Sequence, residues 1–336
     1  MSVLILTGGG TAGHVTPNLA LIPQAKKYFD KIYYMGGSGI EKELAQKAGI
    51  SYLETTVIKF DRKNILSDLK IPYKLHQGVS EAKKVFRSVK PSVVFSKGGY
   101  AALPACLAAK SLSVPVICHE SDYSLGLANK ITSYFAVKTL TSFPETKGGT
   151  YVGNPVREDF LRSLPAPSFF LKLDKRLKTI LVCGGSLGSV AINEAVYKTL
   201  PVLLRKYNVV HICGQNGDLS VHGENYFQLP YTDDFAAVLQ HCDYVVSRSG
   251  SNTLFEIASL GKPCLTVPLP KGTSRGDQIL NARSFEKRGF CKVLPQENLS
   301  PETLIQGIDG LAAFPNNKLD VSKTNETIIK TLVSYL

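Results

Sequence analysis

Three glycine-rich segments each follow a short apolar run, a pattern that can bind an anion. They lie at 4–13 (LILTGGGTAG), 93–99 (VVFSKGG) and 181–188 (LVCGGSLG). A glycine turn between a strand and a helix brings backbone N–H groups and the positive end of the helix dipole close to a negatively charged ligand. A single turn of this kind is often only structural. Three in one chain predict ligand sites at the carboxyl ends of parallel strands.

Three titratable residues close to such turns could move a proton. His14 follows the first glycine turn, and an imidazole can accept a proton near neutral pH. Glu120 and Asp122, in the segment HESD at 119–122, are rival candidates. A packing or hydrogen-bonding role for His14 stays open beside a role as general base.

Several other chemistries find no support in the sequence. The glycine turns carry neither a Walker lysine nor the G-x-G-x-x-G dinucleotide pattern. The six histidines show no paired spacing with cysteines or carboxylates, and no Asp-x-Asp motif is present. Nucleotide hydrolysis and hydride transfer are therefore disfavoured, and no tightly bound metal or other cofactor is expected.

The elements that must position these residues alternate in type along the chain. Short β-branched runs lie at 3–6, 31–35, 92–95 and 114–118, and again at 179–183, 209–213, 244–247 and 264–267. Amphipathic segments of helix length separate them. The pattern predicts an α/β fold with parallel sheets. A chain of 336 residues exceeds one ordinary core, so two domains are expected, with 155–176 as the linker because it contains three prolines.

Composition narrows the setting of the protein. The seven cysteines are odd in number and mostly lie inside apolar runs, as reduced core thiols do. No signal peptide and no run of about 18 apolar residues is found, so any membrane association is expected to be peripheral. The net charge is +12, mostly in the N-terminal half; such an excess could attract nucleic acid or an anionic membrane surface, and a simple solvated face is the default interpretation.

Four motifs in one order resemble the glycosyltransferases of family 28. They are GGGTAGHVTP at 8–17, SKGGY at 96–100, GGSLG at 184–188 and RSGSNTLFE at 248–256, and SRGDQILNA at 274–282 extends the match. The resemblance implies two Rossmann-like domains facing a deep cleft, the GT-B architecture. It implies an inverting transfer of N-acetylglucosamine from UDP-GlcNAc to the C4 hydroxyl of undecaprenyl-diphospho-N-acetylmuramoyl-pentapeptide (lipid I). The product would be lipid II of peptidoglycan synthesis.

The resemblance also implies how the chain divides its work. Residues 1–157 would form the acceptor-binding, membrane-facing domain and 158–336 the UDP-sugar domain, whose last helix could pack back on the first. Ser186 and its neighbouring amides would hold the diphosphate, Glu256 the ribose, and Gln278 the sugar hydroxyls. Glu256 can also be read as part of a capping box with Thr253. The donor residues would be Thr11, Ala12, Gly13, Arg157, Ser186, Thr232, Ser251, Glu256, Asp277 and Gln278.

The acceptor side would include Gly98 and Gly99 and a membrane-surface segment between 62 and 75. Apolar Ile65, Leu66 and Leu69 alternate there with basic residues such as Lys70. An ordinary helix with one buried face is the alternative. The acceptor of the related enzymes is a lipid. The resemblance therefore favours peripheral contact with the anionic inner leaflet, at the cytoplasmic face of a bacterial plasma membrane. No nucleic-acid partner is expected.

Three other functions fit the same motifs. The enzyme could make a glycosyl-diacylglycerol, or it could be an epimerase of the same sugar nucleotide. A non-catalytic module that binds a sugar nucleotide or an anionic membrane would keep donor affinity without turnover.

Overall fold

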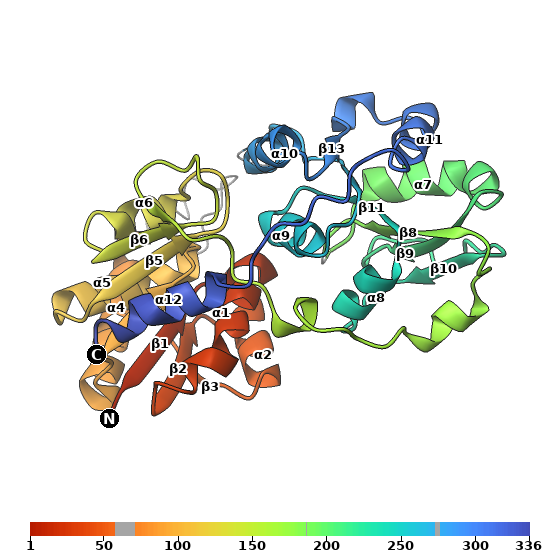
Figure 1. Cartoon of the computed structure of the whole chain (residues 1–336). Helices are drawn as coiled ribbons and strands as arrows, with labels where there is room; N and C mark the ends of the chain where they lie inside the picture. The colour runs from red at the N-terminus through yellow and green to blue at the C-terminus, as the bar shows by residue number, and fades with distance from the viewer. Residues whose placement is uncertain (58–70, 186, 273–275) are drawn as a thin grey trace. The chain divides into compact units, whose positions relative to one another are not determined.

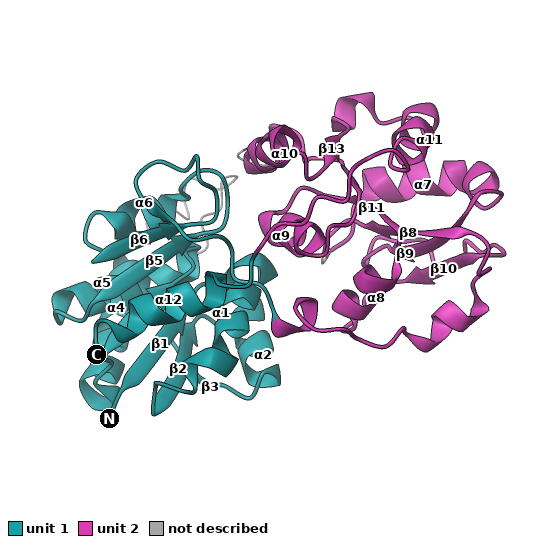
Figure 2. Ribbon diagram, viewed as in Figure 1, with its two compact units in different colours: residues 1–157, 321–336 teal, residues 158–320 magenta. Residues whose placement is uncertain are grey.

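The computed structural model describes residues 1–57, 71–185, 187–272 and 276–336. The chain forms two compact units: Met1–Arg157 with Val321–Leu336, and Glu158–Asp320 (Figure 2). Each unit contains one parallel sheet with helices packed around it (Figure 1). The predicted α/β class with parallel sheets is confirmed.

Unit 1 has a seven-stranded sheet in the order β3-β2-β1-β4-β5-β6-β7. Its strands are β1 (Val3–Thr7), β2 (Lys31–Gly36), β3 (Ser51–Glu54), β4 (Val93–Ser96), β5 (Val116–Glu120), β6 (Lys138–Thr141) and β7 (Thr150–Tyr151). Its helices are α1 (Ala12–Ala25), α2 (Ile40–Lys47), α4 (Ile71–Val89), η1 (Tyr100–Ala102), α5 (Leu103–Ser111), α6 (Leu127–Ser133) and α12 (Thr324–Val333).

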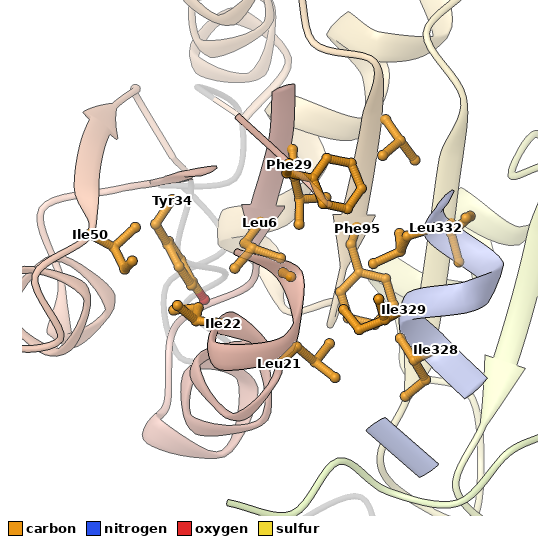
Figure 3. Packing of buried hydrophobic residues seen from close by; sticks show 14 of the residues in the cluster. Leu6, Leu21, Ile22, Phe29, Tyr34, Ile50, Phe95, Ile328, Ile329 and Leu332 are labelled. Carbon is orange, nitrogen blue, oxygen red and sulfur yellow. The ribbon is translucent and has the colours of Figure 1, made fainter. Parts of the chain in front are cut away.

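The core of unit 1 explains why the end of the chain returns to it. All five residues of β1 are buried, as expected for a central parallel strand covered on both faces. Leu6 and Phe95 of neighbouring strands pack with Leu21 of α1 (Figure 3). Ile328, Ile329 and Leu332 of α12 complete this cluster. Helix α12 thus belongs to unit 1, although it follows all of unit 2 in sequence.

Unit 2 has a six-stranded sheet in the order β10-β9-β8-β11-β12-β13. Its strands are β8 (Lys178–Cys183), β9 (Tyr207–Ile212), β10 (Tyr226–Leu229), β11 (Tyr244–Ser247), β12 (Cys264–Thr266) and β13 (Lys292–Val293). Its helices are η2 (Glu158–Phe160), η3 (Ser168–Lys172), α7 (Val190–Leu203), α8 (Phe235–His241), α9 (Ser251–Ser259), α10 (Asp277–Lys287), η4 (Gln296–Asn298) and α11 (Pro301–Asp309).

The proline-containing segment expected to be a linker is packed on unit 2 from Glu158 onward. The Leu164 N–H donates to Gln240 Oε1 at 3.0 Å. The rings of Phe169 and Phe227 stack with their centroids 4.1 Å apart. The prolines mark an irregular stretch, but these contacts make the stretch part of unit 2.

The cysteines and the membrane-related predictions have separate outcomes. All seven cysteines are buried and free, so the prediction of core thiols is confirmed. In the part of the chain that the structure describes, no helix is long and apolar enough to cross a membrane. The predicted membrane residues Ile65, Leu66, Leu69 and Lys70 lie outside the described residues, as does Ser186.

Candidate active site

The first two glycine turns lie against each other at the carboxyl edge of the unit 1 sheet. Gly8 follows β1 and Gly98 follows β4, and these strands are paired. Gly99 has φ +78°, and a Cβ there would lie 2.2 Å from the carbonyl oxygen of Gly9. A side chain at Gly99 would therefore separate the turns. The two segments form one continuous surface.

His14 lies in the first turn of α1, beside both glycine turns. Its Nδ1 is 3.1 Å from the Thr11 hydroxyl oxygen. A Cβ on Gly99 would lie 3.3 Å from the same nitrogen. When Nδ1–H donates to the Thr11 hydroxyl oxygen, Nε2 is unprotonated and is the ring nitrogen that can accept a proton. The structure thus brings three predicted residues, Thr11, His14 and Gly99, together in unit 1.

Glu120 ends β5 and is buried, with both carboxylate oxygens engaged by its own loop. Oε1 accepts from the Asp122 N–H at 3.0 Å. Oε2 accepts from the Gly126 N–H at 2.8 Å and from Asn129 Nδ2 at 2.9 Å. Burial, followed by the charge of Asp122, raises the Glu120 pKa. This arrangement favours a role for Glu120 in ordering the loop before α6, while Asp122 is half-buried in that loop.

Unit 2 contains a cavity of about 640 Å³ at the third glycine turn. This volume lies within the usual range for small-molecule sites. The turn follows β8, and Val190 and Ala191 of the first turn of α7 line the same space, so the positive end of that helix is at the cavity. The lining residues are Gly184, Gly185, Leu187, Gly188, Ser189, Val190, Ala191, Glu194, Asn216, Arg248, Leu269, Gln278 and Gln296.

The backbone of this third turn requires glycine at two places. Gly185 has φ +88° and Gly188 has φ +79°. A Cβ on Gly188 would lie 2.0 Å from the carbonyl oxygen of Cys213, so the turn packs directly on the chain that leaves β9. Ser189 then caps α7, because its hydroxyl accepts from the Ile192 N–H at 3.4 Å. The glycines thus place the helix start at the cavity.

Gln278 and Arg248 add polar groups to the cavity. Gln278 Oε1 accepts from the Leu269 N–H at 3.0 Å, which leaves its amide nitrogen as the donor for a ligand. Arg248 Nη1 donates to the carbonyl oxygens of Val267 at 3.0 Å and Pro268 at 3.3 Å. Burial lowers the Arg248 pKa, but a guanidinium stays charged. Arg248 is the first residue of the RSGSNTLFE motif at 248–256, but no sequence signal distinguished it from the other residues of that motif as a cavity residue.

Four other predicted donor residues of unit 2 lie outside this lining. Ser251 is the first residue of α9, and Glu256 lies half-buried in the same helix. The N-cap of α9 is Gly250, so the alternative capping box of Thr253 with Glu256 is wrong. Thr232 lies in the turn before α8, where its hydroxyl accepts from the Asp234 N–H at 3.0 Å. Asp277 is the first residue of α10.

The remaining predicted donor residues belong to unit 1. Thr11, Ala12 and Gly13 lie at the start of α1, and Arg157 is the last residue of the first stretch of that unit. The predicted donor set is thus divided between the units. Among the described residues, no group of three His, Cys, Asp or Glu side chains is placed to hold a metal ion.

Comparison with known proteins identifies relatives of the whole chain. Residues 4–141 match the glycosyltransferase family 28 N-terminal domain, and residues 179–334 match the C-terminal domain of that family. The protein named UDP-N-acetylglucosamine–N-acetylmuramyl-(pentapeptide) pyrophosphoryl-undecaprenol N-acetylglucosamine transferase of Clostridium botulinum strain Hall is 43% identical, over 98% of this chain and 97% of its own. The protein of the same name from Clostridium novyi is 41% identical, over 92% and 90%.

Solved structures share the fold. MurG of Acinetobacter baumannii has a TM-score of 0.76 at 24% identity and covers 99% of this chain and 100% of its own. The UDP-GlcNAc 2-epimerase of Neisseria meningitidis, bound to UDP-GlcNAc, has a TM-score of 0.64 at 18% identity, with 99% and 100% covered. At these identities the likeness concerns the fold alone. The two domain matches and the close relatives together show that the chain belongs to glycosyltransferase family 28.

Proposed function

We propose that the protein transfers N-acetylglucosamine from UDP-GlcNAc to the C4 hydroxyl of lipid I, giving lipid II. One observation supports this most directly. The unit 2 cavity combines a glycine turn, a helix N-terminus, Arg248 and the amide of Gln278. Relatives more than 40% identical over nearly the full chain carry the name of this transferase.

The donor's diphosphate is the group that this cavity suits. As the sugar leaves, negative charge grows on the departing uridine diphosphate. Backbone N–H groups of Gly185, Leu187 and Ser189, the α7 dipole and the Arg248 guanidinium can stabilise that charge without a metal. Gln278 can donate to a sugar hydroxyl from the same cavity.

The acceptor hydroxyl needs a base, and unit 1 offers one. We assign this role to His14, because it lies beside the two glycine turns with Nδ1 next to the Thr11 hydroxyl. In a single displacement, His14 takes the proton while the hydroxyl oxygen attacks the anomeric carbon, and inversion follows. Asp122 stays an alternative base, whereas both oxygens of Glu120 already bind backbone N–H groups.

A lipid acceptor also calls for contact with a membrane surface. The net charge of +12 favours attraction to an anionic leaflet. Tyr73 is 73% exposed in the first turn of α4, and Lys74 beside it is exposed too. An exposed aromatic next to a cation suits the lipid headgroup region. These features support peripheral binding at the cytoplasmic face of the plasma membrane.

Product analysis tests the proposal. Purified protein is incubated with labelled UDP-GlcNAc and a soluble lipid I analogue, with and without a chelator. The expected product is the β-1,4-linked disaccharide in both reactions. Sugar epimerisation without acceptor, transfer only to diacylglycerol, or donor binding without any turnover would reject it. A reaction that stops with chelator and resumes with Mg²⁺ would contradict metal-free stabilisation of the diphosphate.

A further inference from the structure

Lys97, which follows β4 in the second glycine segment, is completely buried. Its ammonium donates to His119 Nδ1 and, at 3.4 Å, to Asn154 Oδ1. It forms no ion pair with any carboxylate in the described ranges. A buried cation without a directly paired carboxylate costs free energy, so its retention calls for a purpose other than core packing.

The partners of Lys97 all lead to one segment of chain. His119 Nε2 donates to the carbonyl oxygen of Gly153 at 2.8 Å. Asn154 Oδ1 also accepts from the hydroxyls of Ser121 and Ser142, each at 3.1 Å. Side chains from the ends of three neighbouring strands therefore hold residues 153 and 154.

Helix α12 holds the same segment from elsewhere in unit 1. The Val156 N–H donates to Asn325 Oδ1 at 3.3 Å, and Asn325 Nδ2 donates back to the Val156 carbonyl oxygen at 2.8 Å. Gly153 has φ +87°, and a Cβ there would lie 2.7 Å from the Thr324 hydroxyl oxygen. The chain is thus fixed from residue 153 to residue 156, immediately before Arg157.

We propose that Lys97 is a positioning residue: through His119 and Asn154 it fixes residues 153–156 and so sets the place of Arg157, the residue that the family resemblance assigns to the donor. Lys97 itself is buried and does not touch substrate. The inference rests on the proposed function, because Arg157 can affect UDP binding only if the protein uses a UDP-sugar donor and Arg157 contacts it, as the family resemblance implies. A path of charge-assisted and neutral hydrogen bonds thus connects the buried Lys97 ammonium with the backbone next to the half-buried Arg157.

The protonation states in this path agree with such a role. Burial lowers the pKa of Lys97 to about 7, although the carboxylates of Glu120 and Asp122 act in the opposite direction. Burial, followed by the charge of Lys97, lowers the His119 pKa, so the ring is neutral. A neutral ring accepts from Lys97 at Nδ1 and donates to Gly153 at Nε2. As pH rises through 7, Lys97 loses its charge and the path weakens.

The test measures binding of UDP by calorimetry to four full-length proteins: wild type, Lys97→Met, Arg157→Ala and the double variant. At pH 6.5 each single variant should bind UDP about 10-fold more weakly than the wild type. For Lys97→Met, which acts through Arg157, this loss lies within the range seen for indirect coupling. The double variant should bind no more weakly than Arg157→Ala, because Lys97 acts only through Arg157. Lys130→Met, an exposed lysine of α6, is the control and should bind UDP as the wild type does.

Wild-type protein supplies a second measurement that needs no fold-disrupting variant. Its UDP affinity should fall between pH 6.5 and 8.5 as Lys97 loses its charge. The UDP affinity of Arg157→Ala should not show this fall, because Lys97 acts through Arg157. The inference would be overturned if the losses of UDP affinity in the two single variants added up in the double variant. It would also be overturned if UDP affinity depended on pH in the same way in wild type and Arg157→Ala. Absence of UDP binding by the wild type would instead contradict the proposed function.

Discussion

Glu41 accepts a hydrogen bond from the backbone N–H of Gly10 at 3.2 Å, so the chain's own carboxylate occupies the first glycine turn. Its other oxygen accepts from the Gly37 N–H at 3.2 Å. The third glycine turn differs, because Gly184, Gly185, Leu187 and Gly188 line the cavity of about 640 Å³. Two similar stretches of sequence thus have different uses. This contrast supports placing the donor diphosphate in unit 2.

Replacing Glu41 with alanine should destabilise unit 1 and leave donor binding nearly unchanged. The carboxylate is 1% exposed and binds two backbone N–H groups, and its loss leaves both without that partner. We expect a loss of about 2 kcal/mol in the free energy of unfolding. Urea unfolding followed by limited proteolysis of residues 1–157 would measure it.

Glu43 in the same helix provides the control, because its side chain is exposed. Glu43→Ala should unfold at the same urea concentration as the wild type. Equal stability of both variants would show that the two hydrogen bonds of Glu41 contribute little. A large rise in the Kd for UDP in Glu41→Ala would argue against the placement of the diphosphate in unit 2.

Replacing Gln278 with alanine should weaken recognition of the sugar and not of the nucleotide. Among the described residues its amide nitrogen has no hydrogen-bond partner, whereas its oxygen already accepts from the Leu269 N–H, so the nitrogen can donate to a sugar hydroxyl. One hydrogen bond to a neutral group contributes about 1 kcal/mol, so the Kd for UDP-GlcNAc should rise about five-fold. The Kd for UDP alone should stay the same, and calorimetry with both ligands separates the two effects.

Lys287→Ala, at the exposed end of the same helix, is the matched control for Gln278. It should bind both ligands as the wild type does. If Gln278→Ala weakens UDP and UDP-GlcNAc equally, the residue supports the shape of the cavity and does not read the sugar.

Replacing His14 with alanine should abolish turnover and preserve donor binding. Loss of a general base typically slows a reaction by about 10²–10⁴. Because the proposed role of His14 is to take the proton of the acceptor hydroxyl, the Kd for UDP should be unchanged. Initial rates with a lipid I analogue, measured beside UDP calorimetry, give both quantities.

His76 serves as the comparison for His14, since it is an exposed histidine of α4 in the same unit. His76→Ala should retain full turnover. A His14→Ala enzyme with turnover within a factor of two of the wild type would move the role of base to Asp122.

Features set by neighbouring residues could be predicted from the sequence, whereas contacts between residues far apart in the chain could not. The strands and glycine turns follow from local patterns, since β1 is a run of buried residues and Gly99 permits a close backbone contact. The pairing of Gly10 with Glu41 joins residues 31 apart, and that of Lys97 with His119 joins residues 22 apart. No local pattern encodes such pairs, so the buried network was missed.

One mistaken alternative came from a helix boundary. Thr253 and Glu256 have the spacing of a capping box, but α9 begins two residues earlier, at Ser251. Glycine at position 250 takes the N-cap and places Thr253 inside the first turn. Boundaries of helices are the least certain part of a sequence-based prediction, because several residues can serve as the cap.

Removing Tyr73 should weaken binding to anionic vesicles. The side chain is 73% exposed, and an aromatic ring of this kind can enter the headgroup region. We expect the fraction of protein that sediments with phosphatidylglycerol vesicles to fall about three-fold in Tyr73→Ala, and binding to weaken as salt rises. Tyr134, which is 91% exposed elsewhere on unit 1, is the matched control. Equal losses in both variants would contradict a specific role for Tyr73.

Unit 2 should lose stability as pH falls from about 6.5 to 4 because of His211. This ring is completely buried in β9, between the hydroxyl of Tyr226 at 2.9 Å and Asn193 Oδ1 at 3.0 Å. Burial lowers its pKa to about 4, below the value of about 6.5 in the unfolded chain. Between these values the unfolded state binds more protons, so acid favours unfolding.

The loss attributable to His211 should reach about 3 kcal/mol at pH 4 and should be absent above pH 7. His211→Gln cannot titrate, so the drop in its unfolding temperature between pH 7 and 4.5 should be smaller than that of the wild type. His222 is exposed in the same unit, and His222→Gln should keep the full wild-type drop. If His211→Gln and His222→Gln respond to acid alike, other groups cause the loss of stability, since of these two histidines only His211 is a buried neutral ring.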